Sequence, residues 1–272
     1  MSEPNLITWI ASFPRSGNTW LRALITAYAN DGEVDINNIM QTGDKEPGYY
    51  QGIVNAPIGS WTLPHQAMLK PAAMLRMLEH AGSNLLLKTH DWNREIAGVE
   101  QIPPQLTRTA LYVVRDPRDV ALSFMNHYKL ESMDATLDLM LNDDTFTRFP
   151  DSGLFVPQSS WQAHTESWLR KTPYPLHVIR YEDLIEQPFK EFSKVVRILQ
   201  LGFDAKLVKK SINACEFSRF QKAEQEHGFK EGVGQTFFHQ GQARRWEKEM
   251  DQAHLDRIVK SCRRQMKAFG YL

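Results

Sequence analysis

Residues 6–25 constrain the fold of this chain more than any other part of its sequence. They begin with an apolar, β-branched run that predicts a buried strand, and a turn containing Pro14 and Gly17 follows. A strand, a tight Ser/Gly loop and a helix in this order direct backbone N–H groups and the positive end of a helix dipole at one point. We therefore expect an anion site here, although an ordinary strand-to-helix turn would show the same pattern. The helix is indicated by apolar residues at helical spacing, at Leu21, Leu24, Ile25 and Tyr28.

This loop is not a Walker A loop, which needs Gly-x-x-x-x-Gly-Lys-Ser/Thr. No glycine stands five positions before Gly17, and no lysine follows it. Arg15 instead supplies a permanent cation, and the hydroxyls of Ser16 and Thr19 add hydrogen-bond donors. A phosphate or another tetrahedral anion is the ligand that such a loop would bind.

Length and charge limit the classes of partner. The 272 residues suffice for one sizeable α/β domain, and the formal net charge is zero. Nucleic-acid and membrane-surface binders rely on an excess of Lys and Arg, so we expect neither partner. Any anion site must then be a local cluster of cations.

The cysteines and the apolar runs bear on the compartment. Cys215 and Cys262 are the two cysteines, and no CxxC or His/Cys ligand spacing is present, which disfavours a disulfide framework or a zinc site. No apolar run approaches the length of a membrane span, and the first residues lack the pattern of a secretory signal. We expect a soluble, cytoplasmic protein.

Three further apolar runs, within 84–91, 109–114 and 176–184, predict strands that are followed by polar residues or helices. Strands that alternate with helices predict an α/β fold in which helices flank a central parallel sheet in three layers. Ligands gather at the carboxyl ends of such strands, which is where Lys88 and His90 fall. A histidine at a strand end also has a purely structural interpretation. Other helices are expected within 66–80 (beginning at Pro71), 161–170, 204–214 and 249–269.

Three polar segments, 31–65, 130–158 and 216–236, are expected to be irregular loops that cover the substrate and cofactor. They would belong to a single domain that spans residues 1–272. We find no internal repeat and no low-complexity segment.

Two motifs carry a resemblance to a known family. Residues 13–20, Phe-Pro-Arg-Ser-Gly-Asn-Thr-Trp, resemble the 5′-phosphosulfate loop of sulfotransferases that use 3′-phosphoadenosine 5′-phosphosulfate (PAPS), roughly Tyr-Pro-Lys-Ser-Gly-Thr-Thr-Trp. Residues 112–123, Tyr-Val-Val-Arg-Asp-Pro-Arg-Asp-Val-Ala-Leu-Ser, resemble the family's 3′-phosphate motif. Arg115 and Ser123 fall on its two phosphate-contacting positions, although Arg115 and Arg118 could equally be local partners of Asp116 and Asp119.

The resemblance continues toward the C-terminus. Tyr181, in Tyr-Glu-Asp-Leu, matches the family's tyrosine beside the adenine, and Cys215 and Phe217 align with positions that line it. Residues 237–246 are a degraded copy of Phe-Phe-Arg-Lys-Gly-x-x-Gly-x-Trp, in which Phe238, Gly241 and Trp246 match. His239 and Gln240 stand where the family has the Arg-Lys pair that grips the 3′-phosphate. Arg244 and Arg245, a few residues further on, are the nearest replacements for that charge.

The resemblance covers nearly the whole chain and implies a P-loop-like fold and a PAPS-dependent sulfotransferase. The first loop looks most like bacterial members that sulfate small natural products. The reaction would move the sulfuryl group in line to a hydroxyl or amine of a small-molecule acceptor, and it would need no metal. The implied cofactor-binding residues are Arg15, Ser16, Gly17, Asn18, Thr19, Trp20, Arg115, Ser123, Tyr181, Cys215, Phe217, His239, Gln240 and Gly241.

Catalysis of this kind depends on positioning and on charge. Negative charge builds on the bridging oxygen, so Arg15, Lys88 and the backbone N–H groups of residues 16–19 would stabilise it. His90 can take the proton of the acceptor, because an imidazole suits that task at neutral pH.

Two alternatives remain open. A kinase-like phosphoryl-transfer enzyme would also place a phosphate loop on a parallel sheet, but Arg15-Ser16-Gly17 offers no Walker lysine or Mg²⁺-holding pair. A non-catalytic binder of adenosine bisphosphates would fit the departures at His239 and Gln240, and the retention of Lys88-Thr-His90 argues against it. The identity of the acceptor, the choice between O- and N-sulfation and the oligomeric state are left open by the sequence, which lacks the family's common dimer motif after Trp246.

Overall fold

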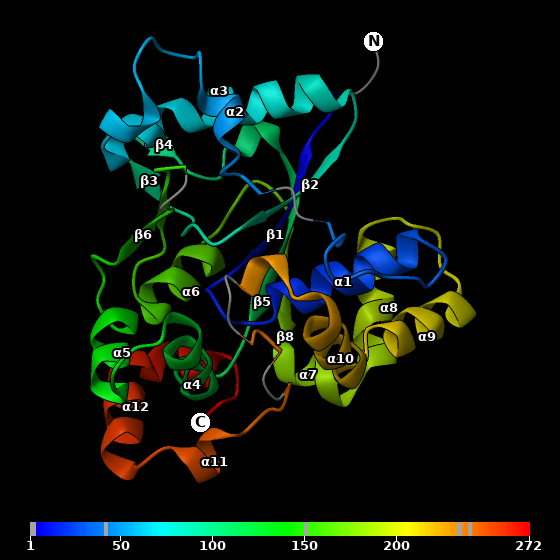
Figure 1. The fold of residues 1–272 in the computed structure, drawn as a ribbon. Coiled ribbons are helices and arrows are strands. Elements are labelled where there is room, and N and C mark those ends of the chain that lie inside the picture. Colours follow the sequence, from blue (N-terminus) through cyan, green and yellow to red (C-terminus); the bar gives the residue numbers. More distant parts are fainter. Residues whose placement is uncertain (1–3, 41–42, 150–151, 233–235, 239–240) are drawn as a thin grey trace.

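Four parallel strands form the central sheet in the computed structural model, which describes residues 4–40, 43–149, 152–232, 236–238 and 241–272 (Figure 1). Their order is β2-β1-β5-β8, and every neighbouring pair is parallel. All residues of β1 are buried, because a parallel sheet covered on both faces needs apolar side chains on both. The strands are β1 (Ile7–Ser12), β2 (Leu85–Thr89), β5 (Thr107–Val114) and β8 (Leu176–Arg180), which are the four that the sequence predicts.

Two groups of helices cover the two faces of this sheet. On one face, Trp9 and Tyr112 belong to the core that includes residues of α3 (Leu63–Ala81), α4 (Pro117–Tyr128), α5 (Met133–Met140), α6 (Trp161–Leu169) and α12 (Gln252–Ala268). On the other face, Ile10 and Leu111 belong to the core with α1 (Asn18–Ala29), α8 (Pro188–Ile198), α9 (Ala205–Ala214) and α10 (Phe217–His227). Figure 1 shows α1, α8 and α9 on one side of the strands and α4, α5, α6 and α12 on the other. The three-layer α/β prediction is confirmed.

Shorter elements join these layers. They are α2 (Pro47–Tyr50), α7 (Tyr181–Glu186) and α11 (Trp246–Glu249), the 3₁₀ turns η1 (Ile58–Ser60), η2 (Pro104–Leu106) and η3 (Lys230–Gly232), and two antiparallel pairs, β3 (Glu95–Ile96) with β4 (Val99–Glu100) and β6 (Phe146–Arg148) with β7 (Phe155–Pro157). Among the described residues, no helix has the length and apolar composition needed to cross a membrane.

The predicted start of α3 at Pro71 is wrong. The helix begins at Leu63, after a capping box in which the Thr62 hydroxyl accepts from the backbone N–H of His65. Pro64 lies in the first turn, where its missing N–H costs nothing. Pro71 therefore sits inside the helix, where it removes one helical hydrogen bond, and the burial of Met74 and Met77 offsets that loss.

The expectation of irregular structure between 216 and 236 is also wrong in part, because α10 occupies Phe217–His227. Its sequence is strongly polar, so its periodicity is weak. Phe220 is 3% exposed and packs with Phe238 at 5.1 Å between ring centroids, so tertiary contacts rather than propensity stabilise this helix. The segment 130–158 likewise contains α5 and the β6–β7 pair, and 31–65 contains α2 and η1.

The packing of β5 predicts a difference between a central and an exposed position of the sheet. Leu111 is fully buried in β5, whereas Val178 in β8 is 41% exposed. Leu111→Ala should lower the free energy of unfolding by about 2–5 kcal/mol, because it leaves a cavity in the core. Val178→Ala should change it by less than about 0.5 kcal/mol. Urea denaturation followed by circular dichroism measures both, and equal losses would contradict the burial of Leu111 relative to Val178.

Candidate active site

A cavity of about 540 Å³ lies at the carboxyl ends of the four parallel strands. The segments that follow β1, β2, β5 and β8 all contribute to its wall, as expected for the crevice edge of an open parallel sheet. Candidate residues from distant parts of the chain thereby meet in one place. Those that line the cavity are Arg15, Gly17, Asn18, Thr19, Trp20, Lys88, His90, Arg115, Ser123, Tyr181, Cys215, Phe217 and Gly241.

The loop between β1 and α1 is shaped by Gly17. Its φ of 101° is left-handed, and a Cβ there would lie 2.5 Å from Cδ2 of Tyr181, so only glycine lets the ring lie against the loop. The side-chain amide of Asn18 donates to the Ile10 carbonyl at 3.0 Å and pins the start of α1. The buried Ser16 hydroxyl has no hydrogen-bond partner within the described part of the chain. An unpartnered buried donor at a helix N-terminus suits an anionic ligand.

Arg15 joins this loop to α4. Its Nε donates to Ser123 Oγ at 3.1 Å, and its guanidinium lies 4.1 Å from the centroid of the Phe237 ring. Burial, with the nearby Arg115 charge also acting downward, lowers the pKa of Arg15 to about 10. The side chain therefore remains cationic at neutral pH. The structure thus places the cation of the first motif beside the hydroxyl of the second.

Arg115 makes a second link between the two motifs. Its Nη1 donates to the Arg15 carbonyl at 3.3 Å, and its guanidinium lies 4.4 Å from the centroid of the Tyr181 ring. Its buried Nε has no partner among the residues that the structure describes. Arg118 forms an ion pair with Asp116 at 2.6 Å, and Arg115 Nη2 lies 4.0 Å from Asp119 Oδ2. The local ion-pair interpretation therefore holds for both arginines, while Arg115 still keeps its Nε as a donor for a ligand.

Lys88 and His90 lie at the end of β2. His90 Nδ1 is 2.8 Å from the backbone carbonyl of Ser12, so Nδ1 carries the proton and donates, and Nε2 keeps its lone pair. Burial, and then the charge of Lys88, lower the pKa of His90 to about 4. The imidazole is therefore neutral at neutral pH, in the tautomer that a general base requires.

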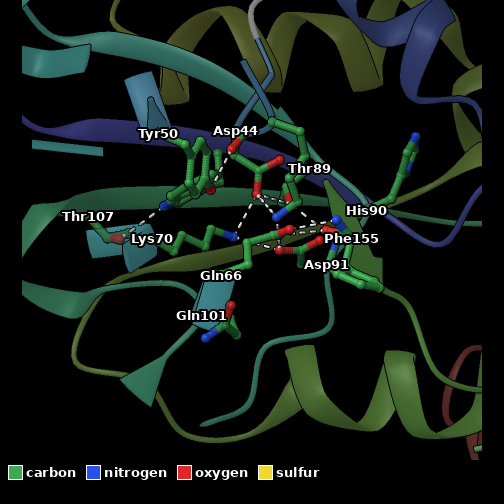
Figure 2. Close-up of polar contacts among 12 residues, drawn as sticks. Asp44, Tyr50, Gln66, Lys70, Thr89, His90, Asp91, Gln101, Thr107 and Phe155 are labelled. Atoms are coloured by element: carbon green, nitrogen blue, oxygen red, sulfur yellow. Dashed lines mark hydrogen bonds and ion pairs between the residues drawn. The ribbon is translucent and has the colours of Figure 1, made fainter. Parts of the chain in front are cut away.

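Four buried charged side chains, those of Asp44, Lys45, Lys70 and Asp91, form a ring of ion pairs next to this strand end. Figure 2 shows Asp44, Lys70 and Asp91 of this Asp44–Lys70–Asp91 ring. Asp44 and Asp91 both pair with Lys70, at 2.6 and 2.7 Å, and both also pair with Lys45. Thr89, between Lys88 and His90, donates to Asp44 at 2.9 Å. Burial alone would raise the pKa of Asp44, but Lys45 and Lys70 hold it below its ordinary value. Two carboxylates and two ammonium groups balance one another here, so the ring fixes the backbone of the candidate site without leaving an unpaired charge.

The adenine-side candidates also lie together. Trp20 Nε1 donates to the Cys215 carbonyl at 3.0 Å, and the rings of Trp20 and Tyr181 meet edge to face with centroids 6.0 Å apart. Burial raises the pKa of the Cys215 thiol to about 12, so this cysteine acts as a small apolar wall. His239 and Gln240 lie outside the described residues. Of the two suggested replacements, Arg245 lines the cavity with its side chain paired to Glu249, whereas Arg244 is 69% exposed.

Sequence reasoning missed several residues of the wall. His127 lies one turn beyond Ser123 on α4, and that spacing was the available signal. Phe237 is the first residue of the degraded motif at 237–246, which was the available signal, whereas no local pattern marks Glu231. The segment 130–158 contributes Thr147, Phe149, Val156 and Gln158, whereas no described residue of 31–65 lines the cavity, so the role of 31–65 as a wall stays a prediction. Within the described ranges, no group of His, Cys, Asp or Glu is placed to hold a metal ion.

Comparisons with known proteins agree with this geometry. The family model described as "Sulfotransferase domain" matches residues 7–270. Sulfotransferase 1B1 of the dog is 25% identical over 210 residues, which are 76% of this chain and 64% of that protein, so the match spans slightly less than two thirds of this curated relative. Mouse sulfotransferase SULT7A1, solved with PAP, is 18% identical with a TM-score of 0.64 over 98% of this chain and 86% of that one. Retinol dehydratase, solved with androsterone and PAP, is 17% identical with a TM-score of 0.64 over 98% and 82%. At these identities the solved structures establish the P-loop-like fold.

The environment of His90 predicts an unusual titration. Because burial disfavours the charged form, the imidazole should keep the neutral Nδ1–H tautomer from neutral pH down to about pH 5, with a midpoint near 4 instead of 6.5. Nitrogen-15 NMR of the ligand-free protein measures this, and a spectrum of His90→Gln assigns the signal. A midpoint near the ordinary value would contradict the burial of the ring beside Lys88, and an Nε2–H tautomer would contradict the hydrogen bond to Ser12.

Proposed function

The chain belongs to the sulfotransferase domain family, and on that premise we propose that it transfers the sulfuryl group of PAPS to a hydroxyl or amine of a small-molecule acceptor. The observation that carries the proposal is the meeting of two phosphate motifs, separated by about a hundred residues in the chain, through the Arg15–Ser123 and Arg115–Arg15 hydrogen bonds. Two buried donors, Ser16 Oγ and Arg115 Nε, have no partner among the described residues. PAPS carries phosphate groups that such donors would bind.

The roles of the binding residues follow from their positions in the cavity. The N–H groups of the first turn of α1 and the Ser16 hydroxyl would hold the 5′ side of PAPS. Arg115 and Ser123 would hold the 3′-phosphate. Aromatic and apolar side chains favour a flat base, so Tyr181, Cys215 and Phe217 would border the adenine. His127 and Arg245 also line this cavity and are candidates for further contacts with the bisphosphate.

The catalytic roles depend on charge and on one proton. When bound, PAPS supplies an activated sulfuryl group whose transfer places negative charge on the bridging oxygen. Arg15 and Lys88 are the cations of the cavity assigned to that charge. The unprotonated Nε2 of His90 would accept the proton of the acceptor hydroxyl or amine. The Asp44–Lys70–Asp91 ring keeps Thr89 in place and so keeps Lys88 and His90 at the same strand end.

The acceptor would enter from the β6–β7 side. Phe149 and Val156 give that part of the wall an apolar character, and Thr147 and Gln158 add polar groups. Two solved structures similar in fold carry androsterone and retinol, respectively, which are small molecules with a hydroxyl group on an apolar skeleton. We propose an acceptor of comparable size, bearing a single nucleophilic group.

The proposal predicts sulfuryl transfer that depends on His90. With radiolabelled PAPS and a panel of phenols, sugars and hydroxylated metabolites, the wild-type protein should label at least one acceptor. His90→Ala should lower kcat by about 10²–10⁴, because a positioned base contributes that much, and should leave the dissociation constant of adenosine 3′,5′-bisphosphate (PAP) near wild type. His227→Ala, at a side chain that is 73% exposed, is the matched control. Bisphosphate binding without transfer to any acceptor would favour a non-catalytic binder, and near-normal kcat in His90→Ala would place the base elsewhere.

The 3′-phosphate assignment makes a separate prediction. Arg115→Ala should weaken PAP binding by about one to two orders of magnitude, since a charge-assisted contact contributes roughly 1.5–3 kcal/mol. Adenosine 5′-phosphate, which lacks the 3′ group, should lose little affinity in the same variant. Isothermal calorimetry measures both ligands, and Arg219→Ala, 64% exposed, serves as the control. An unchanged dissociation constant for PAP would refute the role of Arg115.

A further inference from the structure

Glu231 is an acidic residue in the wall of a cavity that is proposed to bind an anionic ligand. Glu231 lies in η3, and its carboxylate accepts hydrogen bonds from Lys88 Nζ at 3.1 Å and Thr19 Oγ1 at 3.2 Å. Arg22 Nη2 donates to both carboxylate oxygens, at 2.9 and 2.7 Å. Burial alone would raise the pKa of Glu231, but Lys88 and Arg22 lower it to about 2, so the side chain is an anion at neutral pH.

Arg22 explains why an anion is needed at this point. Its side chain is only 1% exposed, and its Nε and Nη1 donate to Asn18 Oδ1 at 2.9 Å and to the Met40 carbonyl at 2.7 Å. Those partners are neutral. Among the described residues, Glu231 is the carboxylate that pairs with Arg22. A buried guanidinium without a counter-ion is strongly unfavourable, so this position must hold negative charge whether or not a ligand is bound.

The donors that hold Glu231 overlap with those assigned to the cofactor. Thr19 belongs to the loop that would bind the 5′ side of PAPS, and Lys88 is a cation assigned to the charge of the transferring group. A sulfuryl group bound by Thr19 and Lys88 would place its oxygens beside the Glu231 carboxylate. Two anions at that separation repel each other in a partly buried site. PAP has no sulfuryl group and would leave the Glu231 contacts in place.

We propose that Glu231 is a specificity residue that favours the desulfated product PAP over the sulfated cofactor, because its carboxylate competes with the sulfuryl group for Lys88 and Thr19. This inference rests on the proposed function. In the absence of a sulfuryl group, Glu231 is the shared counter-ion of Arg22 and Lys88. When a sulfuryl group is present, its oxygens take over part of that role, and the Glu231–Lys88 pair weakens. After transfer, Glu231 restores the counter-charge to Lys88 and thereby stabilises the complex with PAP.

The test compares two ligands that differ at the sulfuryl group. Calorimetry is performed with PAP and with a PAPS analogue in which a methylene group replaces the bridging oxygen, so that no transfer occurs. In Glu231→Gln, the ratio of the dissociation constant of the analogue to that of PAP should fall roughly tenfold, the effect of one charge-assisted contact. Measurement at physiological ionic strength limits the influence of distant charges. Glu226→Gln, a 53% exposed position in the neighbouring α10, removes the same charge and should leave the ratio unchanged.

The outcomes separate this inference from the proposed function. If the wild-type protein binds neither ligand, the proposed function fails and the inference fails with it. If both ligands bind the wild type and Glu231→Gln leaves the ratio unchanged or raises it, only the inference is overturned. Glutamine has the shape of glutamate and its amide oxygen can still accept from Arg22, but the buried guanidinium loses its counter-ion, so circular dichroism first checks that Glu231→Gln is folded, and Glu231→Asp carries the test if it is not. Glu231→Asp is a second variant, which keeps the charge but draws it back from Lys88, and it should shift the ratio in the same direction by a smaller factor.

Discussion

The parallel pairing of β1 with β5 is the constraint on which the site depends. Because the two strands run in the same direction and in register, with Ser12 opposite Val113, the loops that follow them leave the sheet at the same edge. Arg15 and Arg115 therefore become neighbours, and the Arg115 side chain donates to the Arg15 carbonyl. An antiparallel arrangement of the same strands would place these motifs at opposite ends of the sheet.

Buried charge is the second organising feature. The Asp44–Lys70–Asp91 ring and the Arg22–Glu231 pair both contact the end of β2 through its side chains. Lys88 contacts the pair and Thr89 the ring. Neither arrangement follows from hydrophobic packing, and each requires a partner from a distant segment. Their net effect is to fix side chains in a cavity whose chemistry depends on position and charge.

The sequence predicted the elements whose signals are local. The four strands, the start of α4 at Pro117 and the loop containing Gly17 each depend on residues within about one turn or one strand. The errors occurred where tertiary contacts decide the outcome. Pro71 is tolerated inside α3 because buried methionines hold the helix, and α10 forms because Phe220 packs against Phe238. A single-chain pattern contains no information on those partners.

The same division applies to the candidate site. The sequence by itself determined which residues could bind an anion, because Arg15, Ser16 and Gly17 between a strand and a helix have that property wherever the loop lies. Only the tertiary structure decided that Arg15 lies against Ser123, that His90 donates through Nδ1 to Ser12 and that Glu231 neutralises Arg22. These contacts join residues separated by 78 or more positions in the chain, and a hydrogen bond between such residues is determined by the packing of whole elements. Burial is also decided by the tertiary structure, and no sequence pattern specifies it. The pKa of His90 is lowered by the exclusion of water and by the charge of Lys88.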